Sequence, residues 1–306
     1  MEYVSIRHGG AILGEANEIN GLTMGSVGSG TSFNHIEVYA NRDDAFEWFG
    51  GTVNMKYLVA MFHGDDAFDA DQDFDGSAQF LYAVQGDTLC TPSQESQGFE
   101  LDGDDTQQAG LASDGQFFNA TVIGIPANGS KKNSGISVKS RFNGGVYNSI
   151  IANFAYRSIL SGSLGSSTPE LRGNIFVNCS SNETAWNANN TYVPSLAGFD
   201  FNLELARPAD CNGCPVIGDV DPIPSSAGAW VDPIAKTIHP AIVKVNYKGA
   251  FKPGEEAWTA GWTVAAERKF DKTALICPTD VNKDGGTDGL DYLQVLGRFG
   301  KTCVQP

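Results

Sequence analysis

The chain is poor in positive charge and in histidine. Its 306 residues include 20 lysines and arginines against 36 aspartates and glutamates, so the net charge is −16 at pH 7, and there are only 4 histidines. Such a chain repels nucleic-acid phosphates, which excludes nucleic acid as a partner. The sequence also lacks a zinc-binding spacing, a nucleophile elbow and a phosphate-binding loop. Motifs that mark many hydrolases and nucleotide-binding enzymes are therefore absent.

Long hydrophobic runs are missing as well. A membrane-spanning helix needs about 20 consecutive apolar residues, and no stretch approaches that length, so we expect no membrane span. The first residues, Met1 to His8, alternate in the manner of a β-strand and do not resemble a signal peptide. We therefore expect a mature or excised fragment that begins inside a repeated structure.

What the chain does contain is typical of an all-β protein. Glycine is abundant, with 36 residues, while hydrophobic residues make up 41% and charged residues only 18%. Asn, Ser and Thr recur throughout, and there is little helix-forming sequence. The length suffices for one large solenoid or two ordinary domains.

A repeat of 22 residues dominates the first third of the chain. The segments Asp43–Glu47 and Asp65–Asp69 begin 65 − 43 = 22 residues apart, and a partial third copy places Ile36, Leu58 and Phe80 in register. At about 3.3 Å per extended residue, such a repeat traces a loop of roughly 70 Å, enough for three short strands and three bends. The Leu-x-x-Leu-x-Leu pattern of leucine-rich repeats is absent. The repeat predicts an all-β solenoid, a parallel β-helix of about 22 residues per turn.

Stacked repeats place like charges above one another. Residues one repeat apart lie at about the inter-strand spacing of 4.8 Å, so Asp44 is expected beneath Asp66, and Glu47 beneath Asp69. Carboxylates held this close repel one another unless solvent screens them on wet turns or a cation bridges them. Hard oxygen ligands favour Ca²⁺ over Zn²⁺. The predicted Ca²⁺ ligands of this region are Asp43, Asp44, Glu47, Asp65, Asp66, Asp69, Asp71, Asp73 and Asp75.

The domain organisation follows from where this pattern holds. We expect the β-helix over residues 1–180, with one inserted loop at 87–115, where Asp, Gln, Ser and Gly dominate. Residues 181–270 are irregular and rich in aromatic rings, and we expect them to fold back as a cap in which most rings form the core. Residues 271–306 form a separate small module.

The six cysteines are an even number without a zinc-finger spacing. The segment Cys211–Cys214 is expected to close a small disulfide loop, since it is rich in Pro and Asp and does not resemble the strand-to-helix junction of a redox motif. A second pair, Cys277–Cys303, brackets the C-terminal module, which leaves Cys90 and Cys179 as a third. Three disulfides predict an oxidising, extracellular setting.

The sharpest local motif is the segment Asp280–Asp291. Counted from its first residue, oxygen-bearing side chains fall at positions one, three, five, nine and twelve, and Gly285 stands at the sharp turn at six. This is the ligand spacing of an EF-hand loop, except that position twelve carries Asp in place of Glu. Residues 291–299 are expected to form the exiting helix. The predicted Ca²⁺ ligands are Asp280, Asn282, Asp284, Gly286 through its carbonyl, Asp288 and Asp291.

This module resembles a dockerin repeat, as found at the C-termini of secreted bacterial proteins. The resemblance covers about Cys277 to Cys303. A complete dockerin has two such repeats and this chain has one. The resemblance therefore implies Ca²⁺ binding, while the missing repeat argues against a cohesin-type partner.

The N-terminal part resembles secreted bacterial right-handed β-helix proteins of the pectin-lyase-like superfamily. The resemblance spans about residues 1–180 and is carried by Tyr3–Gly10, Asn41–Asn54 and Gly64–Asp66. That superfamily includes lyases, hydrolases, adhesins and phage spikes. The resemblance therefore implies the architecture more than the activity.

Two classes of function are compatible with these features. The first is a non-catalytic, Ca²⁺-stabilised, secreted protein with a structural, adhesive or glycan-binding role. An open β-helix end would present unpaired strand edges, through which copies could stack end to end into filaments. Its partners would be an extracellular glycan or other copies of the chain. We favour this class.

The alternative is a Ca²⁺-dependent polysaccharide lyase or a glycoside hydrolase acting on acidic glycans. The candidate catalytic residues for a lyase are Asp43, Asp65 and Asp66 as ion ligands and Arg42 or Lys56 as the base. A hydrolase would instead use paired aspartates at inverting distance, for which residues 43–44 and 65–66 are candidates. Cationic residues are scarce near these acidic segments, so an anionic polymer would be repelled.

Overall fold

The structure is a computed structural model of the chain. It describes residues 1–14, 19–85, 95–103, 112–124, 132–180, 186, 189–194, 220–224 and 228–267. These residues form strands β1 to β16 and one short helix, α1 (Val264–Glu267). None of the described helical segments is long and apolar enough to cross a membrane.

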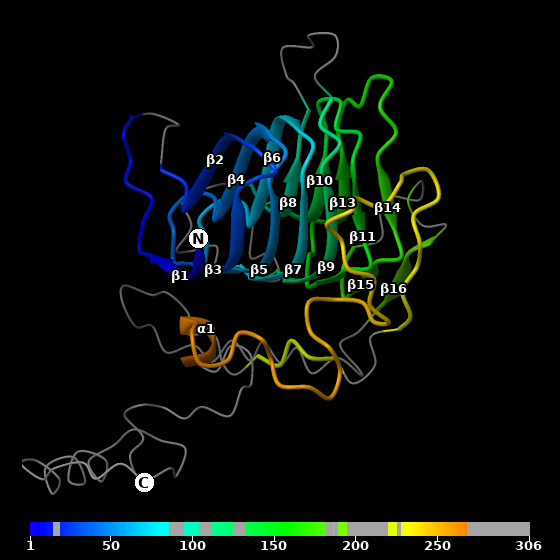
Figure 1. Cartoon of the computed structure of the whole chain (residues 1–306). Helices are drawn as coiled ribbons and strands as arrows, with labels where there is room; N and C mark the ends of the chain where they lie inside the picture. The colour runs from blue at the N-terminus through cyan, green and yellow to red at the C-terminus, as the bar shows by residue number, and fades with distance from the viewer. Residues whose placement is uncertain are drawn as a thin grey trace, which may run out of the picture.

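The strands form two parallel sheets (Figure 1). The ten-stranded sheet contains β1 (Glu2–Arg7), β3 (Ser32–Tyr39), β5 (Asn54–Met61), β7 (Ser77–Val84), β9 (Gln116–Ile123), β11 (Gly145–Tyr147), β12 (Ile150–Ala152), β14 (Glu170–Arg172), β15 (Ile175–Val177) and β16 (Thr191–Val193). The six-stranded sheet contains β2 (Leu22–Val27), β4 (Phe46–Gly51), β6 (Phe68–Phe74), β8 (Glu95–Leu101), β10 (Lys132–Val138) and β13 (Arg157–Ser161).

From β1 to β10, strands that follow one another along the chain alternate between the two sheets. β3, β5 and β7 stack in the ten-stranded sheet, while β4 and β6, which lie between them in sequence, stack in the other. Each of these coils therefore contributes a strand to each sheet. The predicted parallel β-helix is confirmed, and it continues past residue 180 to β16.

The repeat slips by one residue in the third coil. The register between β4 and β6 shifts at a bulge, where Gln72 and Asp73 both take positive φ angles, 52° and 70°. The extra residue moves the next strand along, so Leu58 pairs with Leu81 and not with Phe80, as the 22-residue period predicted. Bulges of this kind insert one unpaired residue and leave the flanking strands intact.

The interior between the sheets is filled with large apolar rings. Strand residues alternate between this core and the outside, so Phe46, Trp48, Phe68 and Phe99 point inward and are fully buried. The rings of Phe46 and Phe68, one coil apart, stack at 5.8 Å between centroids.

The prediction of one inserted loop at 87–115 is wrong in its middle. β8 lies there and pairs with β6 and β10 as a regular member of the six-stranded sheet. Its sequence, ESQGFEL, is mostly polar because Phe99 and Leu101 supply its large core side chains, while Gln97 enters a buried hydrogen-bonded stack. The polar composition therefore concealed a core strand.

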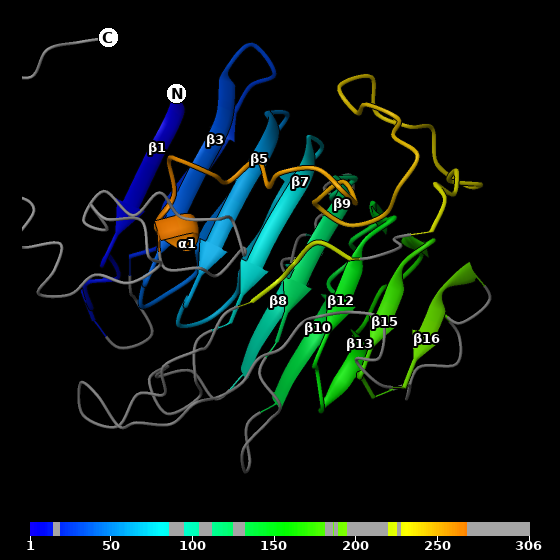
Figure 2. The same cartoon turned by 90° about the horizontal axis from the view of Figure 1, so that it is seen from below.

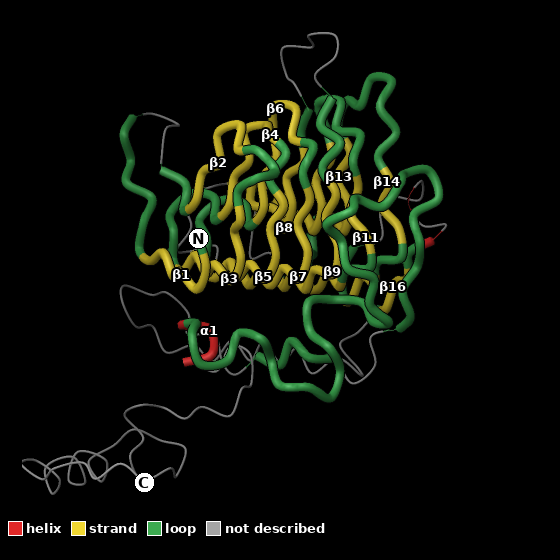
Figure 3. Tube along the Cα trace, in the orientation of Figure 1, coloured by secondary structure: helices red, strands yellow, loops and turns green. Residues whose placement is uncertain are grey.

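Residues 228–267, here called the strap, run along the outer face of the ten-stranded sheet (Figure 2). The strap is irregular except for α1 (Figure 3). Phe251 and Trp258 stack on each other and pack with outward-facing Tyr82 and Val84 of the sheet in a second apolar cluster. Phe251 is buried in this cluster, while Trp258 and Trp262 pack against it partly buried. The strap covers a side of the β-helix, however, and is not a cap over the end of the β-helix.

Side-chain amides of the β-helix hold the strap as a neighbouring strand would. The amide of Gln79 donates to the carbonyl of Val243 (2.6 Å) and accepts from its N–H (2.9 Å). Asn148 makes the same pair of bonds with Val231, at 2.9 and 2.8 Å. Each amide satisfies one donor and one acceptor of the strap backbone, which lets an irregular segment lie on a sheet without leaving buried polar groups unpaired.

The strap ends at a buried carboxylate. Glu37 of β3 is fully buried, and its two oxygens accept the N–H groups of Val264 and Ala265, each at 3.0 Å. Ser5 of β1 donates to the same carboxylate. One side chain therefore joins the first two strands of the ten-stranded sheet to the first turn of α1.

Replacing Glu37 by alanine should detach this end of the strap. Two buried N–H donors would lose their acceptor, at about 1–3 kcal/mol each, so we expect the free energy of unfolding to fall by roughly 3 kcal/mol. Urea unfolding measures the loss, and limited proteolysis should cut the variant within 228–267. Glu2→Ala, which removes an exposed glutamate of β1, is the matched control. Equal stability of the two variants would contradict the anchoring role.

Candidate functional site

A column of carboxylates lies on the outer face of the six-stranded sheet. Glu47 of β4 pairs in register with Asp69 of β6, which pairs with Glu100 of β8. Their neighbours Phe46, Phe68 and Phe99 face the core, so these three side chains point outward. The name acidic ladder is used here for Asp43, Asp44, Glu47, Asp65, Asp66, Asp69, Glu100 and Asp102.

The structure brings five predicted ligands of the acidic ladder together. Carboxylate oxygens of Asp43, Asp44 and Asp65 lie within 4.8 Å of one another, and so do those of Asp44, Glu47 and Asp69. Calcium binds oxygen at about 2.3–2.6 Å, so two ligands on opposite sides of one ion lie roughly 5 Å apart. Both groups therefore have the dimensions of a calcium site, and Asp44 belongs to both.

These carboxylates are shielded from water although they point away from the core. Asp44 and Glu47 each expose 7% of their surface and Asp69 exposes 9%. Burial, and then the charge of Asp65, raises the pKa of Asp44 well above its usual range. Burial and the charge of Asp43 raise the pKa of Glu47 to about 8. Without a cation, Glu47 is therefore expected to retain its proton at neutral pH.

One oxygen in this group has no hydrogen-bond partner. Asp69 Oδ1 is buried and accepts no hydrogen bond from the residues that the structure describes, and the carboxylates of Asp44, Glu100 and Glu47 add to burial in raising the pKa of Asp69. A buried acceptor left unpaired is costly. A cation placed between Asp44, Glu47 and Asp69 would satisfy this oxygen.

Asp66 makes hydrogen bonds between coils that the sequence did not predict. Asp44 Oδ1 accepts the backbone N–H of Asp66 at 2.8 Å, and Asp66 Oδ1 in turn accepts the N–H of Gln97. The stack continues to the next coil, where Gln97 accepts the N–H of Ser134 at 2.9 Å. Asp66 thus links coils through the backbone and belongs to neither three-carboxylate group. Its continuation by Gln97 and Ser134 was not foreseen, because neither residue is acidic.

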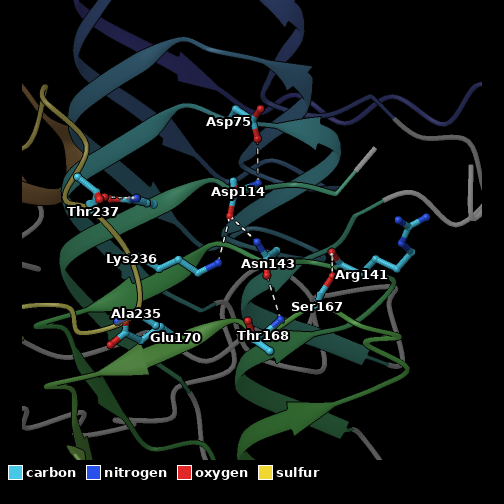
Figure 4. A network of polar contacts seen from close by, with 11 residues as sticks. Asp75, Asp114, Arg141, Asn143, Ser167, Thr168, Glu170, Ala235, Lys236 and Thr237 are labelled. Carbon is cyan, nitrogen blue, oxygen red and sulfur yellow. Dashed lines mark hydrogen bonds and ion pairs between the residues drawn. The ribbon is translucent and has the colours of Figure 1, made fainter. Parts of the chain in front are cut away.

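The remaining predicted ligands lie outside both three-carboxylate groups. Asp71 comes before the bulge, and its charge contributes to the raised pKa of Glu47. Asp73 and Asp75 lie at the bulge and after it. Asp75 instead enters another polar network (Figure 4). Its Oδ1 accepts the N–H of Asp114 at 3.0 Å, and the carboxylate of Asp114 pairs with Lys236 of the strap at 3.3 Å.

The candidate catalytic groups come from two parts of the β-helix. Lys56 lies on β5 in the ten-stranded sheet, whereas the acidic ladder follows the six-stranded sheet and its turns. Arg42 precedes Asp43 in the turn before β4. Oxygens of Asp43 and Asp65 lie within 4.8 Å of each other, so these two carboxylates could share one ion. The catalytic roles of these residues, and of the pairs 43–44 and 65–66, stay predictions.

A cation that sequence reasoning missed stands at the far end of the ladder. Lys139 Nζ lies 3.4 Å from Glu100 Oε1 and 3.1 Å from Asp102 Oδ2. The lysine follows β10, 37 residues after Asp102 in the chain. No fixed period connects them, because coil length varies along this chain.

Two further predictions concern the cysteines and the C-terminal module. Cys179 is a free thiol, so the predicted pair with Cys90 is wrong; burial raises the pKa of Cys179 to about 12. The pairs Cys211–Cys214 and Cys277–Cys303 lie outside the described residues. So does the loop Asp280–Asp291, and calcium binding by its six predicted ligands stays a prediction.

The raised carboxyl pKa values predict how stability depends on pH. In the presence of a chelator, protons on the buried carboxyls stabilise the folded state below the unfolded pKa of about 4. This contribution is lost as the pH rises through about 8, the folded value at Glu47. The free energy of unfolding should therefore fall from about pH 5 to about pH 8 with chelator, and much less with calcium. Urea unfolding at pH 5 and pH 8, each with chelator and with calcium, checks this prediction. A free energy of unfolding that rises with pH in the presence of chelator would contradict it.

Comparison with known families agrees with this architecture. A family model described as a pectate-lyase like beta helix domain matches residues 1–189, more than half of the 306 residues. Comparisons with curated proteins and with solved structures found no match. The matched residues contain the acidic ladder and every strand of both sheets except β16. The chain therefore belongs to the family of pectate-lyase-like β-helix domains.

Proposed function

We propose that this protein is a non-catalytic, calcium-stabilised, secreted β-helix with a structural, adhesive or glycan-binding role outside the cell. The observation that carries the proposal is the position of Asp44, Glu47 and Asp69. They come from successive coils, their oxygens lie within 4.8 Å, and they are almost inaccessible to solvent. An ion held there joins two coils and is shielded from a polymer.

An extracellular role fits the chemistry of these ligands. Calcium sites of extracellular modules work at dissociation constants of about 10⁻⁴–10⁻³ M, a range in which the surroundings can keep the site filled. A net charge of −16 also favours binding of divalent cations. The family description is compatible with a glycan as the partner.

The alternative, a calcium-dependent polysaccharide lyase, is favoured by one observation: an ammonium group lies on the acidic ladder. Lys139 is unsuited to act as the base, however. Burial lowers its pKa, but the charges of Glu100 and Asp102 outweigh that effect and raise the pKa above the ordinary value. A lysine that stays protonated cannot abstract a proton from a uronate.

Calcium should raise the thermal stability of the protein, and the effect should depend on the buried carboxylates. At 100 times the dissociation constant, a ligand stabilises the folded state by about 2.7 kcal/mol. Asp69→Asn should lose most of the calcium-dependent rise in Tm. Asp73→Asn, a change outside both carboxylate groups, is the matched control, and Asp280→Ala separates the contribution of the C-terminal loop.

Two results would count against this function. An equal calcium-dependent rise in Tm for Asp69→Asn and Asp73→Asn would show that calcium does not bind at the acidic ladder. Formation of unsaturated products from polygalacturonate or alginate by the wild-type protein, lost in Asp69→Asn, would establish the lyase instead.

We also propose that copies of the chain associate end to end through the first coil. β1 and β2 are the edge strands of their sheets, and an unpaired edge recruits further strands. Five large apolar side chains of this coil are exposed to solvent: Met1, Tyr3, Ile12, Leu13 and Ile19. An exposed apolar group beside two open edges is the kind of surface that an interface covers.

This association predicts particles that grow with protein concentration. Leu13→Glu, at a side chain 66% exposed, should reduce them to monomers, while Ile234→Glu, at a side chain 72% exposed on the strap, should not. Sedimentation velocity over a range of concentrations distinguishes the two variants. A wild-type protein that remains monomeric at every concentration would contradict end-to-end association.

A further inference from the structure

Lys139 occupies the coil that follows the acidic ladder. Its backbone N–H donates to the carbonyl of Leu101 at 3.0 Å, which places it one coil beyond Asp102. From there the side chain reaches back, and its ammonium group lies between Glu100 and Asp102, at 3.4 and 3.1 Å. The lysine is thus seated on the preceding coil as an ion would be.

The next coil leaves room for this arrangement. A Cβ atom added to Gly162, which donates its N–H to the carbonyl of Val138 at 2.9 Å, would lie 2.8 Å from Cβ of Lys139. A side chain at Gly162 would therefore displace the lysine. The stem of Lys139 is held by the coils on both sides, so its ammonium position is built into the stack.

The carboxylates at the two ends of the acidic ladder differ in the charges around them. Glu100 and Asp102 have the ammonium of Lys139, whereas the pKa of Asp69 is raised by carboxylates alone after burial. Asp102 Oδ1 is nonetheless buried and, within the described ranges of the chain, accepts no hydrogen bond. The end of the ladder therefore retains an unused ligand atom although a cation is already present.

We propose that Lys139 is a built-in substitute for a metal ion, which excludes calcium from Glu100 and Asp102 and so confines it to the coils of β4 and β6. The inference rests on the proposed calcium-binding function of the acidic ladder. A divalent ion at Glu100 would lie close to the ammonium group, and like charges at such distances repel each other. Removing the ammonium group therefore opens a latent site.

The test is calcium titration of the full chain by calorimetry, with Lys139→Gln against wild type. Lys139→Gln should bind one more calcium ion per chain than wild type, and its Tm should respond more strongly to calcium. Lys139→Arg keeps the charge and should bind the wild-type number. In the double variant Glu100→Gln/Lys139→Gln, the latent site loses a ligand, and the additional ion should disappear.

Equal numbers of bound calcium ions in wild type and Lys139→Gln would overturn the inference. So would a Tm of Lys139→Gln that is lowered relative to wild type by the same amount with calcium and with chelator, because that is the effect of losing an ordinary ion pair. If Lys139→Gln unfolds in chelator, recovery of its β circular dichroism on adding calcium supports the latent site, and failure to recover overturns it. The proposed function is decided separately, by comparing wild type with Asp69→Asn. If Asp69→Asn loses calcium binding but Lys139→Gln gains none, the inference about Lys139 fails while the proposed function stands.

Discussion

The repulsion between carboxylates on successive coils is the constraint on which this molecule depends. A parallel β-helix sets the spacing of equivalent residues at about 4.8 Å, and side chains cannot move apart without breaking the register. Here that spacing stacks Glu47, Asp69 and Glu100 in one column, with Asp44 beside it. Protons, a cation or a lysine can neutralise such a column. The raised pKa values of Asp44 and Glu47 and the position of Lys139 are consequences of this one geometry.

The outer faces of the two sheets carry different kinds of side chain. The ten-stranded sheet carries apolar side chains outward, and the strap covers them, held by amides such as Gln79 and Asn148 and anchored at Glu37. The six-stranded sheet instead carries charge outward, in carboxylates such as those of Asp44, Glu47 and Asp69 that are buried. What neutralises those charges therefore affects the cohesion between its coils, and on the proposed function we expect that face to respond to pH and to calcium.

Much of this arrangement could be predicted from the sequence because the repeat is written in it. Two copies of one short sequence motif were enough to predict that Asp44 lies beneath Asp66 and Glu47 beneath Asp69, as observed. Prediction failed where coil length changes. The bulge at Gln72 shifted the partner of Leu58, and β8 was hidden by its polar composition. Lys139 was missed for the same reason, since its contact with Asp102 spans coils of unequal length, and the path of the strap depends on tertiary contacts that no local pattern records.

Anomalous diffraction from crystals of the protein grown with calcium tests the central claim most directly. The account predicts a peak bound by Asp44, Glu47 and Asp69 at calcium–oxygen distances of about 2.3–2.6 Å, with the ammonium of Lys139 still between Glu100 and Asp102. Carboxylates paired with one another through shared protons, with no peak on the acidic ladder at a calcium concentration that fills the C-terminal loop, would contradict it.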